Sequence, residues 1–214
     1  MYIKWINCNV SLHLKDKFSL AQEKWIRTKS AKGFVAQTGG WNSKDETEAC
    51  IISFWENKYA LQYFMTNFHD QIFIENKQDQ FYSSIAVDHF NSNLTLEGES
   101  STFIQAIKNA HILRIADCRV KNDKVEHFEQ MQKEIWQPGM KNAKGMLIGY
   151  CSKSTNDTNA YLITSFWDSQ ENHQKYVDNI LHGLREKADV INDLETIAGK
   201  QLFLVDSWKI LKDY

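Results

Sequence analysis

The sequence lacks several features that mark common classes of protein. It contains a single proline, Pro138, so no segment between domains can act as a rigid proline-rich spacer. It has no run of about 18 apolar residues, so we expect neither a transmembrane helix nor a membrane partner. Its first residues do not resemble a signal peptide, which predicts a cytoplasmic protein. In that compartment the cysteines should be reduced thiols: Cys8, Cys50, Cys118 and Cys151.

Motifs of the well-known enzyme classes are also missing. No Cys-x-x-Cys or His-x-x-x-His pair is present, and no Gly-x-Ser-x-Gly elbow. We therefore predict no metal and no other cofactor, and hydrolase, kinase and dehydrogenase mechanisms are disfavoured. The formal net charge is −2 and the basic residues are scattered, which argues against a nucleic-acid partner. Aromatic residues are abundant, with 7 Trp, 8 Tyr and 12 Phe, and these can pack a core or line a pocket for a flat ligand.

What the chain does contain is an internal repeat. The segment Ser53–Glu56, Ser-Phe-Trp-Glu, returns as Ser165–Asp168, Ser-Phe-Trp-Asp, at a shift of 112 residues. Lys32–Phe34 returns as Lys144–Met146 at the same shift. Matches that keep their order at a nearly constant offset indicate two copies of one domain-sized unit. Only the gaps between matches change in length, which is typical of loops.

Both copies show the same order of predicted elements, β-α-β-β-α-β. In the first unit we predict strands at 2–10, 34–41, 49–55 and 80–90. The predicted helices are at 18–30 and after the N-cap residue Asn57. In the second unit we predict strands at 111–120, 146–151, 159–167 and 201–211. Its predicted helices run from 125 to before Pro138 and over 176–184, with a further short helix at 188–194. The predicted domains are a first repeat at 1–90, a linker with a short helix at 91–110, and a second repeat at 111–214.

This pattern predicts an α+β fold of two tandem ferredoxin-like units. A β-α-β-β-α-β unit places both helices on one face of its sheet and leaves the other face bare. Two such sheets in one chain can cover each other and close an α/β barrel within the chain. We therefore expect a monomeric pseudo-dimer or a homodimer.

The repeat resembles the dimeric α/β-barrel superfamily, which includes antibiotic-biosynthesis-type monooxygenases and haem-degrading enzymes. Three motifs resemble the YdbC-like family of Firmicutes in particular: Gly39-Gly40-Trp41, Ser53-Phe54-Trp55-Glu56 and Arg114-Ile115-Ala116-Asp117-Cys118. That resemblance covers essentially the whole chain. It implies a ligand site between sheet and helices or inside the barrel, and it specifies the fold better than the chemistry.

Candidate site residues follow from the comparison of the two copies. Lys4 pairs with Arg114, and a basic residue inside both first strands suggests contact with an anion; a snorkelling side chain and a salt bridge are the alternatives. Asn7 and His69 are the candidate catalytic residues, with His69 as a general base. The candidate ligand-binding residues are Lys4, Gln37, Trp41, Trp55, Phe64, Arg114, Trp167 and Tyr176. The tryptophans among them could equally be core residues.

Three functions remain open. The first is a small-molecule-binding protein, at best a cofactor-independent monooxygenase-like enzyme acting on an aromatic substrate. The second is a haem-binding or haem-degrading protein, which the resemblance implies through Asn7 and for which His69 or His182 would be the ligand. The third is a non-catalytic, stress-related or interaction scaffold. Because Phe64 is replaced by Tyr176 and Gln37 by Gly149, we predict that at most one unit is active.

Overall fold

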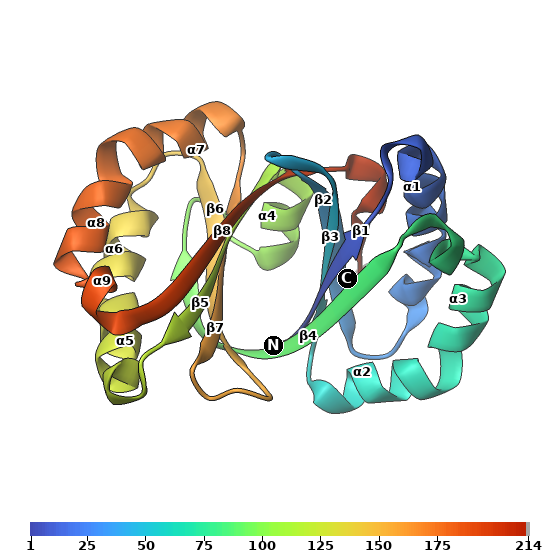
Figure 1. Ribbon diagram of the computed structural model, residues 1–214, viewed down its shortest axis with the longest axis horizontal. Helices are drawn as coiled ribbons and strands as arrows, with labels where there is room; N and C mark the ends of the chain where they lie inside the picture. Colours follow the sequence, from blue (N-terminus) through green and yellow to red (C-terminus); the bar gives the residue numbers. More distant parts are fainter. Residues whose placement is uncertain (213–214) are drawn as a thin grey trace. The chain divides into compact units, whose positions relative to one another are not determined.

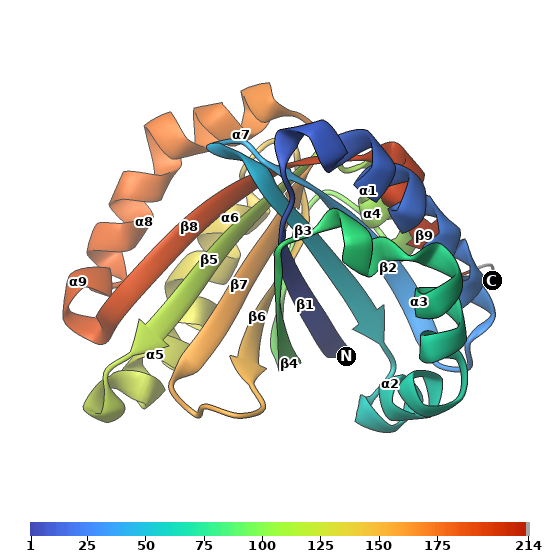
Figure 2. The same cartoon turned by 45° about the vertical axis from the view of Figure 1, so that its right-hand side comes forward.

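The computed structural model describes residues 1–212, which form two compact units. Unit 1 contains residues 1–89 together with the C-terminal residues from Leu202 onward, and unit 2 contains Phe90–Gln201. Figures 1 and 2 show the elements of both units coloured along the chain.

The sheet of unit 1 is antiparallel, in the order β4-β1-β3-β2. Both of its helical segments lie on one face of that sheet (Figure 2). The elements are β1 (Tyr2–Asn9), η1 (Leu12–Leu14), α1 (Lys15–Glu23), η2 (Lys24–Ser30), β2 (Phe34–Asn42), β3 (Asp45–Trp55), α2 (Lys58–Phe64), the π-helical η3 (Met65–His69), α3 (Asp70–Asn76), η4 (Gln78–Phe81) and β4 (Ser84–Glu97).

Unit 2 repeats this arrangement with the order β8-β5-β7-β6, and the helices between β5 and β6 and between β7 and β8 cover one face (Figure 1). The elements are α4 (Phe103–Asn109), β5 (Ile112–Val120), η5 (Asn122–Lys124), α5 (Val125–Met131), η6 (Gln132–Trp136), α6 (Gln137–Lys141), β6 (Met146–Ser154), β7 (Ala160–Trp167), α7 (Gln170–Tyr176), η7 (Val177–Leu181), α8 (His182–Lys187), α9 (Val190–Asp193), β8 (Leu194–Leu204), η8 (Asp206–Trp208) and β9 (Ile210–Leu211). The predicted α+β class with tandem ferredoxin-like units is confirmed.

Further strand pairings extend each sheet. In unit 1, β2 also pairs with residues 202–204 of β8 and with β9. In unit 2, β6 pairs with residues 90–97 of β4. The strands β4 and β8 therefore each begin in one unit and end in the other, and unit 1 is not a contiguous stretch of chain.

The shift of 112 residues is preserved in the backbone geometry. The helices that follow β3 and β7 begin at Asn57 and Ser169, whose side chains accept hydrogen bonds from the backbone N–H groups of Ala60 and Asn172. Lys77 and Asp189, which lie at the ends of the same helices, both adopt the left-handed region, with φ of 49° and 50°. The two π-helical turns η3 and η7 also match at this shift. The register between the second helices is thereby fixed, so Phe64 matches Tyr176 and His69 matches Leu181.

Two predicted elements differ from the structure. Residues 91–97 of the expected linker belong to β4, because Leu94 and Leu96 point inward while Asn93 and Thr95 are exposed. This strand alternation was masked by the polar composition of the segment. The short helix after it is confirmed as α4. The strand expected at 201–211 is divided by η8, which places the side chain of Trp208 in the core of unit 1.

Candidate functional site

A row of polar side chains crosses the sheet of unit 1. Lys4 on β1 lies opposite Ser53 on β3, and Ser53 lies opposite Gln37 on β2. Residues directly opposed across an antiparallel pair point to the same face. The Lys4 ammonium nitrogen lies 3.6 Å from the Sδ atom of Met65 on η3, so this face is the one that the helices cover. Trp55, two residues after Ser53, donates a hydrogen bond of 3.1 Å to the Ser53 hydroxyl. The structure thus brings together the predicted residues Lys4, Gln37 and Trp55.

Two members of this row have unusual environments. Burial lowers the pKa of Lys4 from 10.5 to about 8. No carboxylate among residues 1–212 forms an ion pair with it, so the salt-bridge alternative for Lys4 is not observed. The Nε2 atom of Gln37 is buried and donates to no described residue. Unpaired buried polar groups are uncommon, and they mark a place where a ligand or water would gain hydrogen bonds.

His69 ends the π-helical turn η3 and is surrounded by aromatic rings. Its ring centroid lies 5.3 Å from that of Trp25, 6.1 Å from Phe64 and 5.8 Å from Phe73, which stacks on it. Its Nδ1 atom lies 2.9 Å from an Asp70 carboxylate oxygen. Burial lowers the pKa of His69, the Asp70 hydrogen bond opposes this shift, and the charge of Lys4 lowers the pKa further. The imidazole is therefore neutral at neutral pH and can accept a proton.

Asn7, the second predicted catalytic residue, lies on the opposite face of the sheet. Asn7 is three residues after Lys4 on β1, so the two side chains point to opposite faces of the sheet. The Oδ1 atom of Asn7 accepts a hydrogen bond of 3.2 Å from the Cys50 thiol. The structure therefore does not bring Asn7 and His69 together. The prediction paired them because sequence alone does not tell which face of a strand meets the helices.

Trp41 is also separate from this group. Its ring packs against Phe18 and Trp208, and the Lys15 ammonium lies 4.5 Å from its ring centroid. These residues form a hydrophobic cluster of their own, different from the one that contains Trp55 and Phe64. Trp41 is a packing residue at the end of β2 rather than a neighbour of the polar row.

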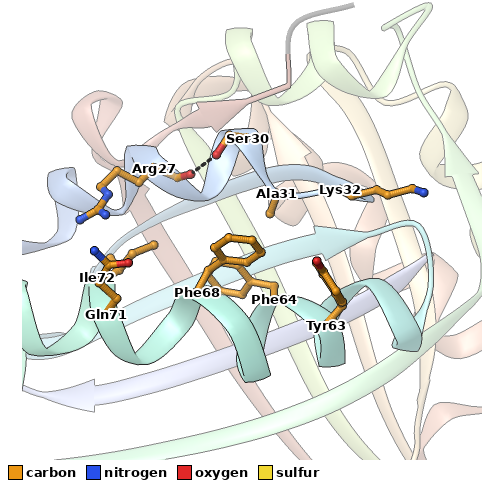
Figure 3. A pocket seen from close by; sticks show the side chains of 9 residues that line it. All are labelled: Arg27, Ser30, Ala31, Lys32, Tyr63, Phe64, Phe68, Gln71 and Ile72. Atoms are coloured by element: carbon orange, nitrogen blue, oxygen red, sulfur yellow. Dashed lines mark hydrogen bonds between the residues drawn. The ribbon is translucent and has the colours of Figure 1, made fainter.

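A pocket of about 690 Å³ opens between η2 and the helical segment α2–α3 (Figure 3). Its aromatic wall comes from α2 and η3, and its cationic groups come from η2 and the turn that follows it. The lining residues are Arg27, Ser30, Ala31, Lys32, Tyr63, Phe64, Phe68, Gln71 and Ile72. Phe64 is the one residue that we predicted among them. Its ring lies 5.1 Å from that of Trp55, so it separates the pocket from the polar row.

The pocket residues that the prediction missed left a readable signal. Phe68 stands four residues after the buried Phe64 and four before the buried Ile72, yet Phe68 is 43% exposed, and Tyr63 is 55% exposed. Neighbouring exposed aromatic rings on one helix are a sign of a binding surface. Arg27 forms an ion pair with Glu75, which leaves its guanidinium at the edge of the pocket.

Unit 2 carries a related but different group. Arg114 lies opposite Ser165, and the Ser165 hydroxyl accepts a hydrogen bond of 2.9 Å from Trp167. The Trp167 ring lies 4.9 Å from Tyr176 and 5.2 Å from His173. The predicted residues Arg114, Trp167 and Tyr176 are therefore brought together, and His173 joins them.

His173 was missed, although it stands three residues before Tyr176 on the same buried stripe. The shift of 112 matches it to Leu61, so a titratable residue replaces an apolar one at a core position. This difference between the two units could have identified His173 from the sequence. His182, the haem-ligand candidate of unit 2, matches Asp70 instead; its side chain is 85% exposed and pairs with Glu186.

Several other properties bear on the choice of function. All four cysteines are buried and none is in a disulfide, and burial raises the pKa values of Cys8 and Cys118 to about 12, which disfavours their reactive thiolate forms. Among residues 1–212 no three His, Cys, Asp or Glu side chains are grouped to hold a metal ion. No helix in that part of the chain is long and apolar enough to cross a membrane.

Comparison with known proteins identifies the relatives of this chain. Residues 2–90 match a domain of unknown function, DUF4937, and residues 111–182 match the antibiotic biosynthesis monooxygenase family. YdbC of Bacillus subtilis is 39% identical over 72 residues, which are 33% of this chain. The chain is a YdbC-like homologue. The match spans 60% of the length of YdbC.

Solved structures agree with the fold of this YdbC-like chain. A protein of Lactobacillus acidophilus that is assigned as a monooxygenase is 16% identical, with 99% of each chain covered and a TM-score of 0.73. An anthrone oxidase-like protein is 12% identical, with 95% of this chain and 91% of the other covered and a TM-score of 0.69. At such low identity the likeness shows a monooxygenase-like ferredoxin fold and nothing about the ligand.

Proposed function

We propose that unit 1 binds a small aromatic molecule with an acidic group in the pocket between η2 and α2–α3. The observation that carries this proposal is the composition of the pocket, which has aromatic rings on one side and the cations Arg27 and Lys32 on the other. Its volume of about 690 Å³ is in the range of small-molecule sites. A flat ring would pack on Phe68 and Tyr63 while its acidic group faces the cations.

We further propose that the bound molecule is oxidised by dioxygen without a cofactor. His69 lies behind Phe64 as seen from the pocket, so the Phe64 ring would have to turn aside before the neutral imidazole could accept a proton from an activated methylene group of the substrate. The Lys4 ammonium would stabilise the resulting anion. That anion passes an electron pair to O₂ and forms a C–O bond, the resulting peroxide anion takes the proton back from His69 to give a hydroperoxide, and loss of water leaves a ketone, so CH₂ and O₂ become C=O and H₂O. The monooxygenase-like fold and the anthrone oxidase-like relative support this chemistry.

Anthrone is a suitable probe of the aromatic wall and of the oxidation, because it is flat and has one activated methylene group; it has no acidic group and so does not test the cations. Binding is measured without oxygen by the fluorescence of the tryptophans beside the pocket, Trp25 and Trp55. Oxygen uptake and quinone absorbance are then followed after air is admitted. We expect Phe68→Ala to weaken binding, and the matched change in unit 2, Ile180→Ala, to leave binding unchanged.

The proton-accepting role has its own variant. His69→Leu introduces the residue that unit 2 carries at the matching position, Leu181. We expect it to keep anthrone binding and to lower oxygen uptake by about 100-fold or more. His182→Ala, on the exposed surface, is the control and should be unaffected. If the unaltered protein binds anthrone without taking up oxygen, the proposed oxidation is wrong and the proposed binding site stands. If it does not bind anthrone at all, both proposals are wrong.

A further inference from the structure

We propose that unit 2 contains a second site of different specificity, which binds a small aromatic carboxylate. Arg114, His173 and Tyr176 would hold the carboxylate, and Trp167 would support the ring. The site is separate from the pocket in unit 1 and does not depend on the function proposed for that pocket.

Arg114 supplies the permanent positive charge. Its side chain is half-buried on the helix-covered face of β5, and its Nη1 atom donates a hydrogen bond of 3.0 Å to the carbonyl oxygen of Lys200. That is its only hydrogen bond to a described residue, and no described carboxylate pairs with it. The β8 backbone lies against the guanidinium, because a Cβ atom on Gly199 would stand 2.5 Å from Nη2. The guanidinium is thus fixed in place with most of its donors unused.

His173 supplies the second observation. It is only 4% exposed, and neither ring nitrogen has a hydrogen-bond partner among residues 1–212. Buried polar groups in proteins are nearly always hydrogen-bonded, so an imidazole left in this state indicates a missing partner. The Tyr176 hydroxyl, one helical turn further along, also bonds to no described residue. The two rings have centroids 6.4 Å apart and both pack on Trp167.

The protonation states of these groups favour the binding of an anion. Burial lowers the pKa of His173 to about 4, and the charge of Arg114 contributes, so its imidazole is neutral and retains one N–H donor. Burial raises the pKa of Tyr176, so its hydroxyl stays protonated and can donate. A guanidinium with two neutral donors matches the several acceptor positions of a carboxylate. The flat Trp167 ring beside them favours a ligand in which the carboxylate is attached to an aromatic ring.

Unit 1 cannot offer the same site, because the matching residues are Lys4, Leu61 and Phe64. Only one of the three polar groups is kept there. The repeat therefore supplies three replacements that the fold already accepts: Arg114→Lys, His173→Leu and Tyr176→Phe.

Benzoate is the probe, and benzyl alcohol is the uncharged control. We follow the imidazole ¹⁵N and attached ¹H signals of His173 by NMR while benzoate is added to the full-length protein. We expect a saturable shift of these signals with benzoate and none with benzyl alcohol. His173→Leu and Tyr176→Phe, followed through the indole N–H signal of Trp167, should each weaken benzoate binding.

Arg114 should contribute most to affinity. Loss of a hydrogen bond to a charged group corresponds to a decrease in affinity of about 10- to 100-fold, which we expect for Arg114→Met. Arg114→Lys keeps the charge and should weaken binding less. The control is Arg119→Met, because Arg119 lies further along β5, is exposed, and is already paired with Asp157 and Glu195. The proposal is overturned if benzoate does not bind at 10 mM, or if it binds with unchanged affinity to Arg114→Met.

Discussion

At the scale of single residues, Lys4 combines a cost to stability with a proposed role in binding. Its ammonium is partly buried beside a thioether, a weak acceptor, and no described carboxylate balances its charge. A residue that destabilises the fold and is still present at the centre of the polar row fits the trade-off between stability and function that binding sites often show. The trade-off can be measured, because the same burial that lowers the pKa of Lys4 acts on the free energy of unfolding.

We expect Lys4→Met to stabilise the protein at about pH 7. A pKa lowered from 10.5 to about 8 corresponds to a destabilisation of about 3 kcal/mol while the lysine is charged in both states, which is the case below pH 8. Between pH 8 and 10.5 the unfolded chain still binds the proton that the folded protein has lost. The stability of the unaltered protein should therefore rise with pH across this window, and the advantage of the variant should shrink. Urea unfolding of both proteins at pH 7 and pH 10 measures the difference.

Lys44→Met is the control, because Lys44 is exposed in the turn between β2 and β3. It should change the free energy of unfolding by less than about 0.5 kcal/mol at either pH. A Lys4→Met variant that is no more stable than the unaltered protein at pH 7 would show that burial does not penalise this charge.

His173 should make the protein sensitive to acid. Its pKa is about 4 in the folded protein and 6.5 ordinarily, so on acidification the unfolded state binds its proton first. The contribution of His173 to stability is therefore complete above pH 6.5 and is lost as the pH falls toward 4, by about 3 kcal/mol. His173→Leu should remove this loss. The measurement is the difference in unfolding free energy between the two proteins at pH 7 and pH 4.5; parallel pH dependences would contradict the prediction.

The sequence allowed some of these residues to be placed and not others. The pairing of Lys4 with Arg114 followed from the repeat alone, and the strand registers agree with it. The separation of Asn7 from His69 could not be predicted, because alternation divides a strand into two faces without telling which face meets the helices. The group around His173 depends on how α7 packs on Trp167 and on how β8 lies against Arg114, and both are properties of tertiary packing.

At the scale of elements, the second helix of each unit depends on its N-cap. Asn57 and Ser169 each accept a hydrogen bond from a backbone N–H that would otherwise be unsatisfied. We expect Asn57→Ala and Ser169→Ala each to lower the free energy of unfolding by about 1 kcal/mol. Denaturant unfolding measures this cost.

The repeat supplies the matched controls for this experiment. Asn57→Ser and Ser169→Asn exchange the caps of the two units and should be nearly neutral, because asparagine and serine are comparable caps. Alanine variants that cost no more than these exchanges would mean that packing alone sets the start of each helix.

Elements with clear hydrophobic periodicity could be predicted, and the exceptions have a common cause. The core strands and the striped helices were identified because burial on one side imposes a regular pattern. The end of β4 was taken for a linker because only Leu94 and Leu96 face inward there and the residues around them are polar. The C-terminal strand was predicted as continuous over 201–211, while the chain forms a 3₁₀ turn at Asp206–Trp208.

At the scale of the whole molecule, unit 1 is completed by the last residues of the chain. The side chains of Trp208 and Ile210 are almost fully buried in its two hydrophobic clusters, and residues 202–204 and β9 pair with β2. The family match over residues 2–90 therefore covers less than the structural unit. Removing these residues takes a tryptophan out of a closely packed core and leaves a strand edge unpaired.

We therefore expect a fragment of residues 1–98 not to fold on its own. It should show no cooperative urea transition and a weak near-ultraviolet circular dichroism signal, although it contains every element of a ferredoxin-like unit. The full chain with Trp208→Ala is the milder test, and it should lose about 3–5 kcal/mol of unfolding free energy, the usual cost of removing a buried tryptophan. A fragment that unfolds cooperatively would show that the C-terminal residues only cover a core that is already stable. Unit 1 would then correspond to the contiguous repeat that the sequence predicted.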